Sequence, residues 1–304
     1  MINKYATGIA VAGSITVDKT PDLVHSGRRK LLCTGCVPNL ALMLKKMSPE
    51  MPINALGRVG DDAEGRYVVQ RLQSAGIDAS GIRAVSGEVT GSRQGMLHAG
   101  APQSFGVCDV EFRKLSCRIL HLGYFLMMDR IDNGDGRNIL KHARRCGMET
   151  SLSMLSGVSD RYAAVLAALP YVDYFTVSME DAAWLVKMDP VTDGVEKIAR
   201  RLLWYGVKKK VFIYSTQWIA CCSKTRYSEV GNYILPENCT CSDEQLCDGF
   251  TAGILEGISN RWSDMKILET ASACAAFQMC QKEPESLEKI LDHCKQFQRR
   301  KKVL

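Results

Sequence analysis

The segment Asp248-Gly249-Phe250-Thr251-Ala252-Gly253-Ile254-Leu255-Glu256-Gly257 is the most informative stretch of this 304-residue chain. It places an acid directly before a run of small and apolar residues that predicts a helix. The backbone N–H groups and the positive dipole end of such a helix favour an anion, and a carboxylate there can take a proton from a hydroxyl group. An aspartate in this position can also act only as a helix N-cap. The segment by itself leaves both interpretations open.

Short β-like runs alternate with amphipathic patterns through most of the chain. We expect strands at residues 8–13, 53–56, 119–122, 150–154, 172–177 and 211–215. We expect helices at residues 63–75, 138–146 and 195–205, each followed directly by a glycine. This alternation predicts an α/β fold with a mostly parallel central sheet and helices on both faces.

Two segments break this alternation. Residues of about 14–32 and 89–110 predict extended strands with turns, which would form a small β lid beside the main sheet. No repeat or linker divides the chain, so we expect a single domain over residues 1–304.

Composition and charge exclude several classes of protein. With 46% hydrophobic and 24% charged residues the chain can bury a large core, and no apolar run reaches the length of a membrane span. We therefore expect a cytoplasmic protein that does not bind a membrane. The net charge is +6, but the last ten residues hold five basic side chains, and the rest has 34 basic against 33 acidic residues. A nucleic-acid partner is not expected, and the basic tail is interpreted as a solvated helix end.

The 13 cysteines follow no disulfide or zinc-finger spacing. Cys33-x-x-Cys36 and Cys239-x-Cys241 could hold zinc only if the fold brought them together, so we interpret them as small apolar residues. His121 lies inside an expected strand and is interpreted as a buried structural residue.

Four further groups of residues accompany the segment 248–257. They are Val11-Ala12-Gly13-Ser14 with Asp18, Gly35-Cys36-Val37-Pro38-Asn39, Gly57 to Gly65 with Gly76-Ile77-Asp78, and Thr90-Gly91 with Ser104-Phe105. In this order along the chain they resemble the motifs of the ribokinase-like (phosphofructokinase-B) carbohydrate kinases. The resemblance implies the ribokinase-like fold and an ATP-dependent kinase that uses Mg²⁺ to phosphorylate a primary hydroxyl of a sugar or nucleoside.

The resemblance also assigns roles on the substrate side. Asp248 would be the general base, while Asp18, Gly35 and Asn39 would bind substrate hydroxyls. Gln245-Leu246-Cys247, with the N-terminus of the following helix, would form the anion hole. In this family the lid commonly mediates dimers, so a homodimer through the lid is expected.

On the nucleotide side, the resemblance implies that Ser178, Thr216 and Gly249 bind ATP and that Asp181 holds Mg²⁺ indirectly. These regions depart most from the family pattern. The glycines before the base are replaced by Gln245 and Cys247, which do not tolerate a positive φ as glycine does. We therefore expect an ATP-dependent sugar kinase whose activity is weakened by these replacements; the alternative is a catalytically impaired pseudokinase that acts as a sugar-binding sensor or assembly subunit.

Overall fold

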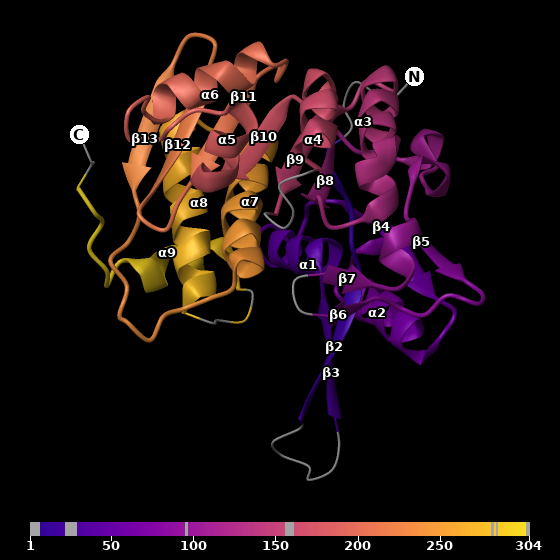
Figure 1. The fold of residues 1–304 in the computed structure, drawn as a ribbon. Helices are drawn as coiled ribbons and strands as arrows, with labels where there is room; N and C mark the ends of the chain where they lie inside the picture. The colour runs from indigo at the N-terminus through magenta and orange to yellow at the C-terminus, as the bar shows by residue number, and fades with distance from the viewer. Residues whose placement is uncertain are drawn as a thin grey trace.

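A nine-stranded sheet forms the centre of the computed structural model, which describes residues 7–21, 29–94, 97–155, 161–280, 283 and 285–301 (Figure 1). Its strand order is β13-β12-β11-β10-β9-β8-β1-β4-β5. The pairs from β5 to β11 are parallel, while β12 and β13 are antiparallel to their neighbours. The strands are β1 (Ile9–Ala12), β4 (Ile53–Gly60), β5 (Asp78–Val85), β8 (Ile119–Phe125), β9 (Glu149–Met154), β10 (Tyr174–Ser178), β11 (Lys210–Tyr214), β12 (Trp218–Ser223) and β13 (Tyr227–Gly231).

Helices cover both faces of this sheet, because successive residues of a strand point to opposite sides. In β1, Ile9 and Val11 join one hydrophobic core, while Ala10 and Ala12 join the other. The first core takes residues from α1 (Cys36–Met47), α2 (Ala63–Ser74), α7 (Asp243–Ser259), α8 (Asp264–Met279) and α9 (Leu287–Cys294). The second core takes residues from α3 (Gly136–Arg145), α4 (Tyr162–Ala168), α5 (Met179–Val186) and α6 (Val195–Trp204).

This architecture confirms the predicted α/β fold with a mostly parallel sheet. The six expected strands correspond to β1, β4, β8, β9, β10 and β11, and the three expected helices to α2, α3 and α6. The sequence analysis did not place β5, β12 or β13. His121 is fully buried in β8, where its ring lies 3.0 Å from the Ser151 hydroxyl, which confirms its structural interpretation.

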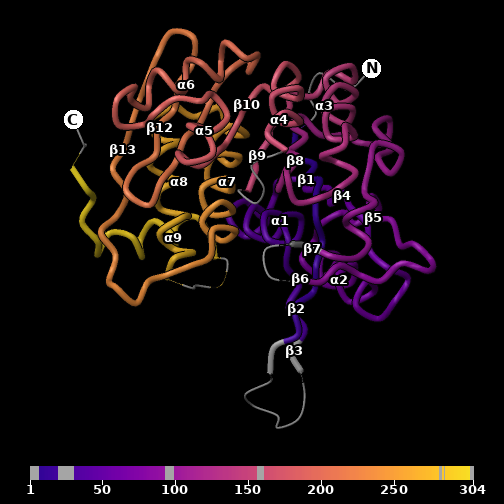
Figure 2. The backbone as a smooth tube through the Cα atoms, in the orientation of Figure 1, coloured from indigo at the N-terminus to yellow at the C-terminus, as the bar shows by residue number. Residues whose placement is uncertain are grey.

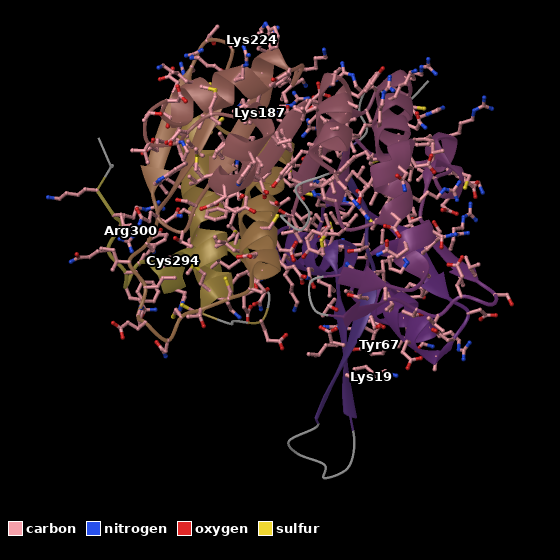
Figure 3. All side chains as sticks on the ribbon, in the orientation of Figure 1. Lys19, Tyr67, Lys187, Lys224, Cys294 and Arg300 are labelled. Carbon is pink, nitrogen blue, oxygen red and sulfur yellow. The ribbon has the colours of Figure 1, made fainter. Side chains whose placement is uncertain are left out.

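Two small sheets lie outside the main one, in the segments expected to form the lid. β2 (Thr16–Pro21) pairs antiparallel with β3 (Arg29–Thr34), and β6 (Ser92–Gln94) with β7 (Leu97–Ala99). The β2–β3 pair projects from the rest of the molecule (Figure 1). α2 holds its base through an ion pair of 2.7 Å between Lys19 and Glu64 and a hydrogen bond from the Tyr67 hydroxyl to the Leu31 carbonyl (Figure 3).

The basic C-terminal segment is not the solvated helix end that we expected. α9 ends at Cys294, and the chain then runs beside the segment that follows β13 (Figure 2). The Arg300 amide donates to the Asn232 carbonyl. The Arg299 guanidinium stacks over the Tyr233 ring at 4.3 Å and donates to the Tyr233 hydroxyl. Backbone pairing therefore positions this segment, and a cation–π contact holds the Arg299 guanidinium.

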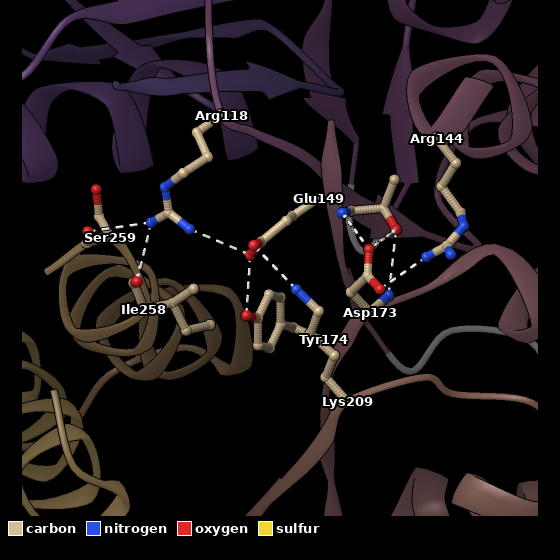
Figure 4. Close-up of polar contacts among 9 residues, drawn as sticks. Arg118, Arg144, Glu149, Asp173, Tyr174, Lys209, Ile258 and Ser259 are labelled. Atoms are coloured by element: carbon tan, nitrogen blue, oxygen red, sulfur yellow. Dashed lines mark hydrogen bonds and ion pairs between the residues drawn. The ribbon is translucent and has the colours of Figure 1, made fainter. Parts of the chain in front are cut away.

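The pair α7 and α8 packs closely because α7 has a glycine every four residues. A Cβ atom on Gly249 would lie 2.7 Å from the Ala275 Cα atom, and one on Gly253 would lie 2.5 Å from the Ala271 Cα atom. At the other end of α7, Arg118 donates to the Ile258 and Ser259 carbonyls (Figure 4). These hydrogen bonds tie the C-terminal end of the helix to the residue that precedes β8. These contacts fix the position of the helix that carries Asp248.

Among the described residues, no helix is long and apolar enough to cross a membrane. Over the same part of the chain, no group of three or more histidine, cysteine, aspartate or glutamate side chains is arranged to hold a metal ion.

The contact between α7 and α8 makes a testable prediction for Gly253→Ala. Replacing a helical glycine with alanine normally stabilises a helix by about 1 kcal/mol. Here the new methyl group would meet backbone atoms of α8, so we expect a net loss of about 1–3 kcal/mol in the free energy of unfolding. Gly257→Ala is the matched comparison in the same helix, because its Cβ would first meet a side-chain atom, Ile267 Cγ1 at 2.6 Å, rather than backbone atoms, so we expect a smaller loss there. Urea unfolding measures both; equal or greater stability of Gly253→Ala would contradict this packing argument.

Candidate functional site

The start of α1 places Asn39 at the carboxyl edge of the sheet. The preceding Gly35 adopts φ 92°, in the left-handed region that favours glycine. A Cβ atom there would also lie 2.8 Å from the Ser14 carbonyl oxygen, so no larger residue fits this turn. Gly35 therefore shapes the turn from which α1 starts, and Asn39 lies in the first turn of that helix.

An irregularity at the end of β8 turns Tyr124 toward α7. The pairing of β8 with β9 shifts register between Leu122 and Phe125, and Tyr124 and Leu126 have φ angles of 55° and 77°. Such bulges redirect side chains and are common near functional sites. The Tyr124 side chain is fully buried as a result.

Asp248 is the point where these elements meet. Its Oδ2 atom accepts hydrogen bonds from the Asn39 amide at 2.8 Å and from the Tyr124 hydroxyl at 2.6 Å. Its Oδ1 atom is buried and has no hydrogen-bond partner among the described residues. The protein thus supplies two hydrogen-bond donors to Oδ2, and no described residue supplies one to Oδ1.

Burial dominates the electrostatics of this carboxyl. It raises the pKa of Asp248 from 3.8 to about 8, although the hydrogen bonds from Tyr124 and Asn39 act in the opposite direction. An isolated buried carboxylate is costly, because the protein solvates it less well than water does. A raised pKa in a pocket is typical of functional carboxyl groups.

A pocket of about 880 Å³ lies against this carboxyl. Three of the residues that the resemblance assigns to the substrate side and the base, namely Asp18, Asn39 and Asp248, line it together. The other polar lining residues include Thr34 from β3, Ser242, Glu244 and Gln245 from the start of α7, and Gln278 from α8. Gly35 is not among the lining residues. The pocket therefore lies between the β2–β3 pair, α1 and the first turns of α7.

The predicted anion hole is not formed, because α7 begins at Asp243 rather than after Asp248. Ser242 caps the helix by accepting from the Gln245 amide, and the Gln245 side chain accepts from the Ser242 amide in return. Leu246 and Cys247 are buried inside the helix, where their N–H groups bond to carbonyls of the preceding turn. The predicted loop is thus a helical segment, and its N–H groups do not converge on a phosphate.

The true N-terminus of α7 is also a poor phosphate site. Asp243 and Glu244 occupy its first turn, where their negative charges would repel an anion. Such acids stabilise the helix by interacting with its dipole, as does the capping box of Ser242 and Gln245. The residues present favour a stable helix over phosphate binding.

The residues expected to bind ATP and Mg²⁺ are not gathered at Asp248. The two oxygens of Asp181 accept from the Tyr162 and Ser178 hydroxyls, which makes this carboxylate part of an internal network. Gly249 packs against α8, and Thr216 lines a separate pocket of about 950 Å³ beside α5 and α6. Among the described residues, Ser178, Asp181 and Thr216 do not line the pocket at Asp248, and their assignment to ATP and Mg²⁺ stays a prediction.

Sequence reasoning missed Tyr124 and the true start of α7. Nothing in the local pattern marks Tyr124, since only the bulge in β8 turns its hydroxyl toward Asp248. The start of α7 did have a signal, because Ser242-Asp243-Glu244-Gln245 has the serine and glutamine spacing of a capping box.

A scan against protein-family models finds no match for this chain, and no curated protein gives a significant match. Solved structures do match. The ribokinase of Arabidopsis thaliana, solved with ribose and ATP, is 18% identical with a TM-score of 0.72, and the match covers 95% of this chain and 99% of that one. Aminoimidazole riboside kinase of Salmonella enterica, complexed with aminoimidazole riboside and an ATP analogue, is 16% identical with a TM-score of 0.75 over 94% and 99% of the two chains.

The 2-dehydro-3-deoxygluconokinase of Thermotoga maritima is a third similar structure, with 14% identity, a TM-score of 0.74 and coverage of 95% of this chain and 99% of that one. All three similarities extend over nearly the whole of both chains, including the main sheet and its helices. This chain therefore has the ribokinase-like fold of the carbohydrate kinases.

Proposed function

We propose that this chain binds a sugar, nucleoside or similar polyol in the pocket lined by Asp18, Asn39 and Asp248. The observation that carries this proposal is the buried, unpartnered Oδ1 atom of Asp248, on a residue that lines this pocket. A buried polar atom without a partner is costly, and a ligand hydroxyl would supply the missing hydrogen bond. We infer that binding, rather than phosphoryl transfer, is the main role of this site.

The pocket offers a chemistry suited to several neighbouring hydroxyls. The Asp18 carboxylate accepts hydrogen bonds, while the Gln278 amide both donates and accepts them. Leu31, Leu42 and Met43 add apolar lining that can contact the carbon face of a sugar ring. This combination of directed polar groups and apolar surface supports a polyol such as a sugar as the ligand.

ATP-dependent phosphorylation is the second candidate. It is favoured by the position of Asp248, because this carboxyl lines the pocket and in its ionised form could take a proton from a substrate hydroxyl, although its raised pKa of about 8 leaves only a fraction ionised at neutral pH. Sugar kinases with the same fold have been solved with ATP, and one with ribose and ATP together. Two observations argue against this candidate. The start of α7 is capped and acidic, and the Asp181 carboxylate already accepts hydrogen bonds from the Tyr162 and Ser178 hydroxyls. No catalytic step through ATP follows from these residues.

The ligand proposal predicts a loss of binding in Asp18→Ala and Asn39→Ala. Each variant removes a directed polar group from the pocket, and removing one such hydrogen bond typically weakens binding by about 1–2 kcal/mol, or roughly tenfold. Isothermal titration with ribose, fructose and adenosine as probes measures the effect.

Asp61→Ala is the control for these variants, because Asp61 is exposed, lies outside the pocket lining and forms an ion pair of 3.4 Å with Arg66. It should bind the probes like the wild type. A sugar that binds all three variants with wild-type affinity would place its site elsewhere and contradict the proposal.

The raised pKa of Asp248 predicts a pH-dependent cost to stability. Between about pH 4 and pH 8 the folded state keeps a proton that the unfolded state has lost, so the free energy of unfolding falls as pH rises through this window. Asp248→Asn lacks this titration. We compare the free energy of unfolding of Asp248→Asn with that of the wild type. From pH 5 to pH 8.5 this difference should shift in favour of the variant by a few kcal/mol, since each pKa unit corresponds to about 1.4 kcal/mol.

Urea unfolding at the two pH values tests this expectation. The matched control is Asp173→Asn, because Asp173 is also buried but accepts from Arg144 at 2.7 Å and from the Thr150 amide at 2.9 Å. Asp173→Asn should be less stable than the wild type at both pH values. If Asp248→Asn and the wild type lost stability in parallel, the carboxyl would not titrate as argued.

Titration with ATP, with and without Mg²⁺, separates the two candidate functions. Since the start of α7 is capped and acidic, we expect no binding at ATP concentrations up to about 1 mM in the wild type.

The triple variant Ser242→Gly, Gln245→Gly, Cys247→Gly removes the capping box and favours unwinding of this turn. Binding of Mg-ATP by this variant alone would support a kinase site lost through these residues. Tight Mg-ATP binding by the wild type, with turnover abolished in Asp248→Asn, would instead establish the kinase.

A further inference from the structure

A pair of cysteines lies at the rim of the pocket, outside the residues that line it. Cys239 belongs to the segment between β13 and α7, and Cys280 follows the last residue of α8. Their Sγ atoms are 2.7 Å apart, and both residues are half-buried, so small reagents can reach them. In Figure 1 the segment that leads from β13 to α7 passes beneath the lower ends of α8 and α9.

This pair joins the two elements that form one wall of the pocket. Three residues after Cys239, Ser242 caps α7 and lines the pocket. Two residues before Cys280, Gln278 lines the same pocket from α8. A covalent bond between the two sulfurs would therefore fix the start of α7 against the end of α8.

We propose that Cys239 and Cys280 are a redox-sensitive pair whose disulfide locks this wall of the pocket. The inference goes beyond ligand binding and does not depend on the identity of the ligand. A disulfide needs an S–S distance of about 2.05 Å, which is a shift of less than 1 Å from the observed contact. The bond would close a ring that contains both α7 and α8 and would restrict the unfolded chain accordingly.

The reaction balances with a peroxide as the oxidant. One thiolate attacks a peroxide oxygen, which breaks the O–O bond and leaves a sulfenic acid and one water molecule. The second thiol then displaces the sulfenic oxygen as a second water molecule, so two electrons and two protons leave the cysteine pair. A dithiol reductant returns the pair to two thiols.

Other cysteines of the chain are less suited to this chemistry. Burial raises the pKa of the Cys33, Cys117, Cys247 and Cys241 thiols to about 12, 11, 12 and 11, and the charge of Asp243 contributes at Cys241. Thiols with such a high pKa form little thiolate, which is the reactive species. Cys108 is exposed and forms no disulfide, so its oxidation serves as the internal reference for a surface thiol.

Peroxide treatment of the full-length chain, followed by alkylation and peptide mapping without reductant, tests the proposal. We expect a linked peptide that contains Cys239 and Cys280, lighter by two hydrogens than the sum of the separate peptides and released by a dithiol. The linked peptide should form in Cys108→Ser and Cys241→Ser but not in Cys239→Ser or Cys280→Ser.

Thermal unfolding gives a second readout. The oxidised wild type should unfold at a temperature higher by at least about 3 °C than the reduced protein, while Cys239→Ser should show no such difference. Two results would overturn the proposal. One is separate alkylation of Cys239 and Cys280 after Cys108 has been fully oxidised; the other is a disulfide of either cysteine with Cys241.

Discussion

The hydrogen bonds to Asp248 connect parts of the chain that are distant in sequence. Asn39 near the N-terminus and Tyr124 in the middle of the sheet both donate to one oxygen of this carboxyl on α7. The contact requires α1, β8 and α7 to meet at the same edge of the sheet. That edge is where ligands bind in open α/β folds, and it is where the pocket lies.

The position of α7 is itself set by packing on both sides of Asp248. Gly249 and Gly253 let α7 approach α8, and Arg118 holds the far end of the helix. The glycines in this segment therefore serve helix packing rather than the approach of a phosphate. Burying the Asp248 carboxyl costs free energy, and this cost falls at a position where a ligand can complete the hydrogen bonds of the carboxyl.

The two halves of the site differ in how well they match the family that the sequence resembles. Asp18, Asn39 and Asp248 share one pocket, as expected for binding of a polyol. On the side assigned to the nucleotide, Ser178 and Asp181 bond to each other, and the segment expected to form the anion hole is helical. The geometry of the described residues therefore matches the family's substrate side more closely than its nucleotide side.

The sequence by itself determined the fold class and the positions along the chain of six strands and three helices. Alternating apolar runs and glycine-terminated helices predict these features, because they depend on local periodicity. Only the tertiary structure decided that Tyr124 donates to Asp248 and that Cys239 meets Cys280. These features depend on a bulge in a strand and on contacts between distant segments, whose geometry local residue patterns do not specify.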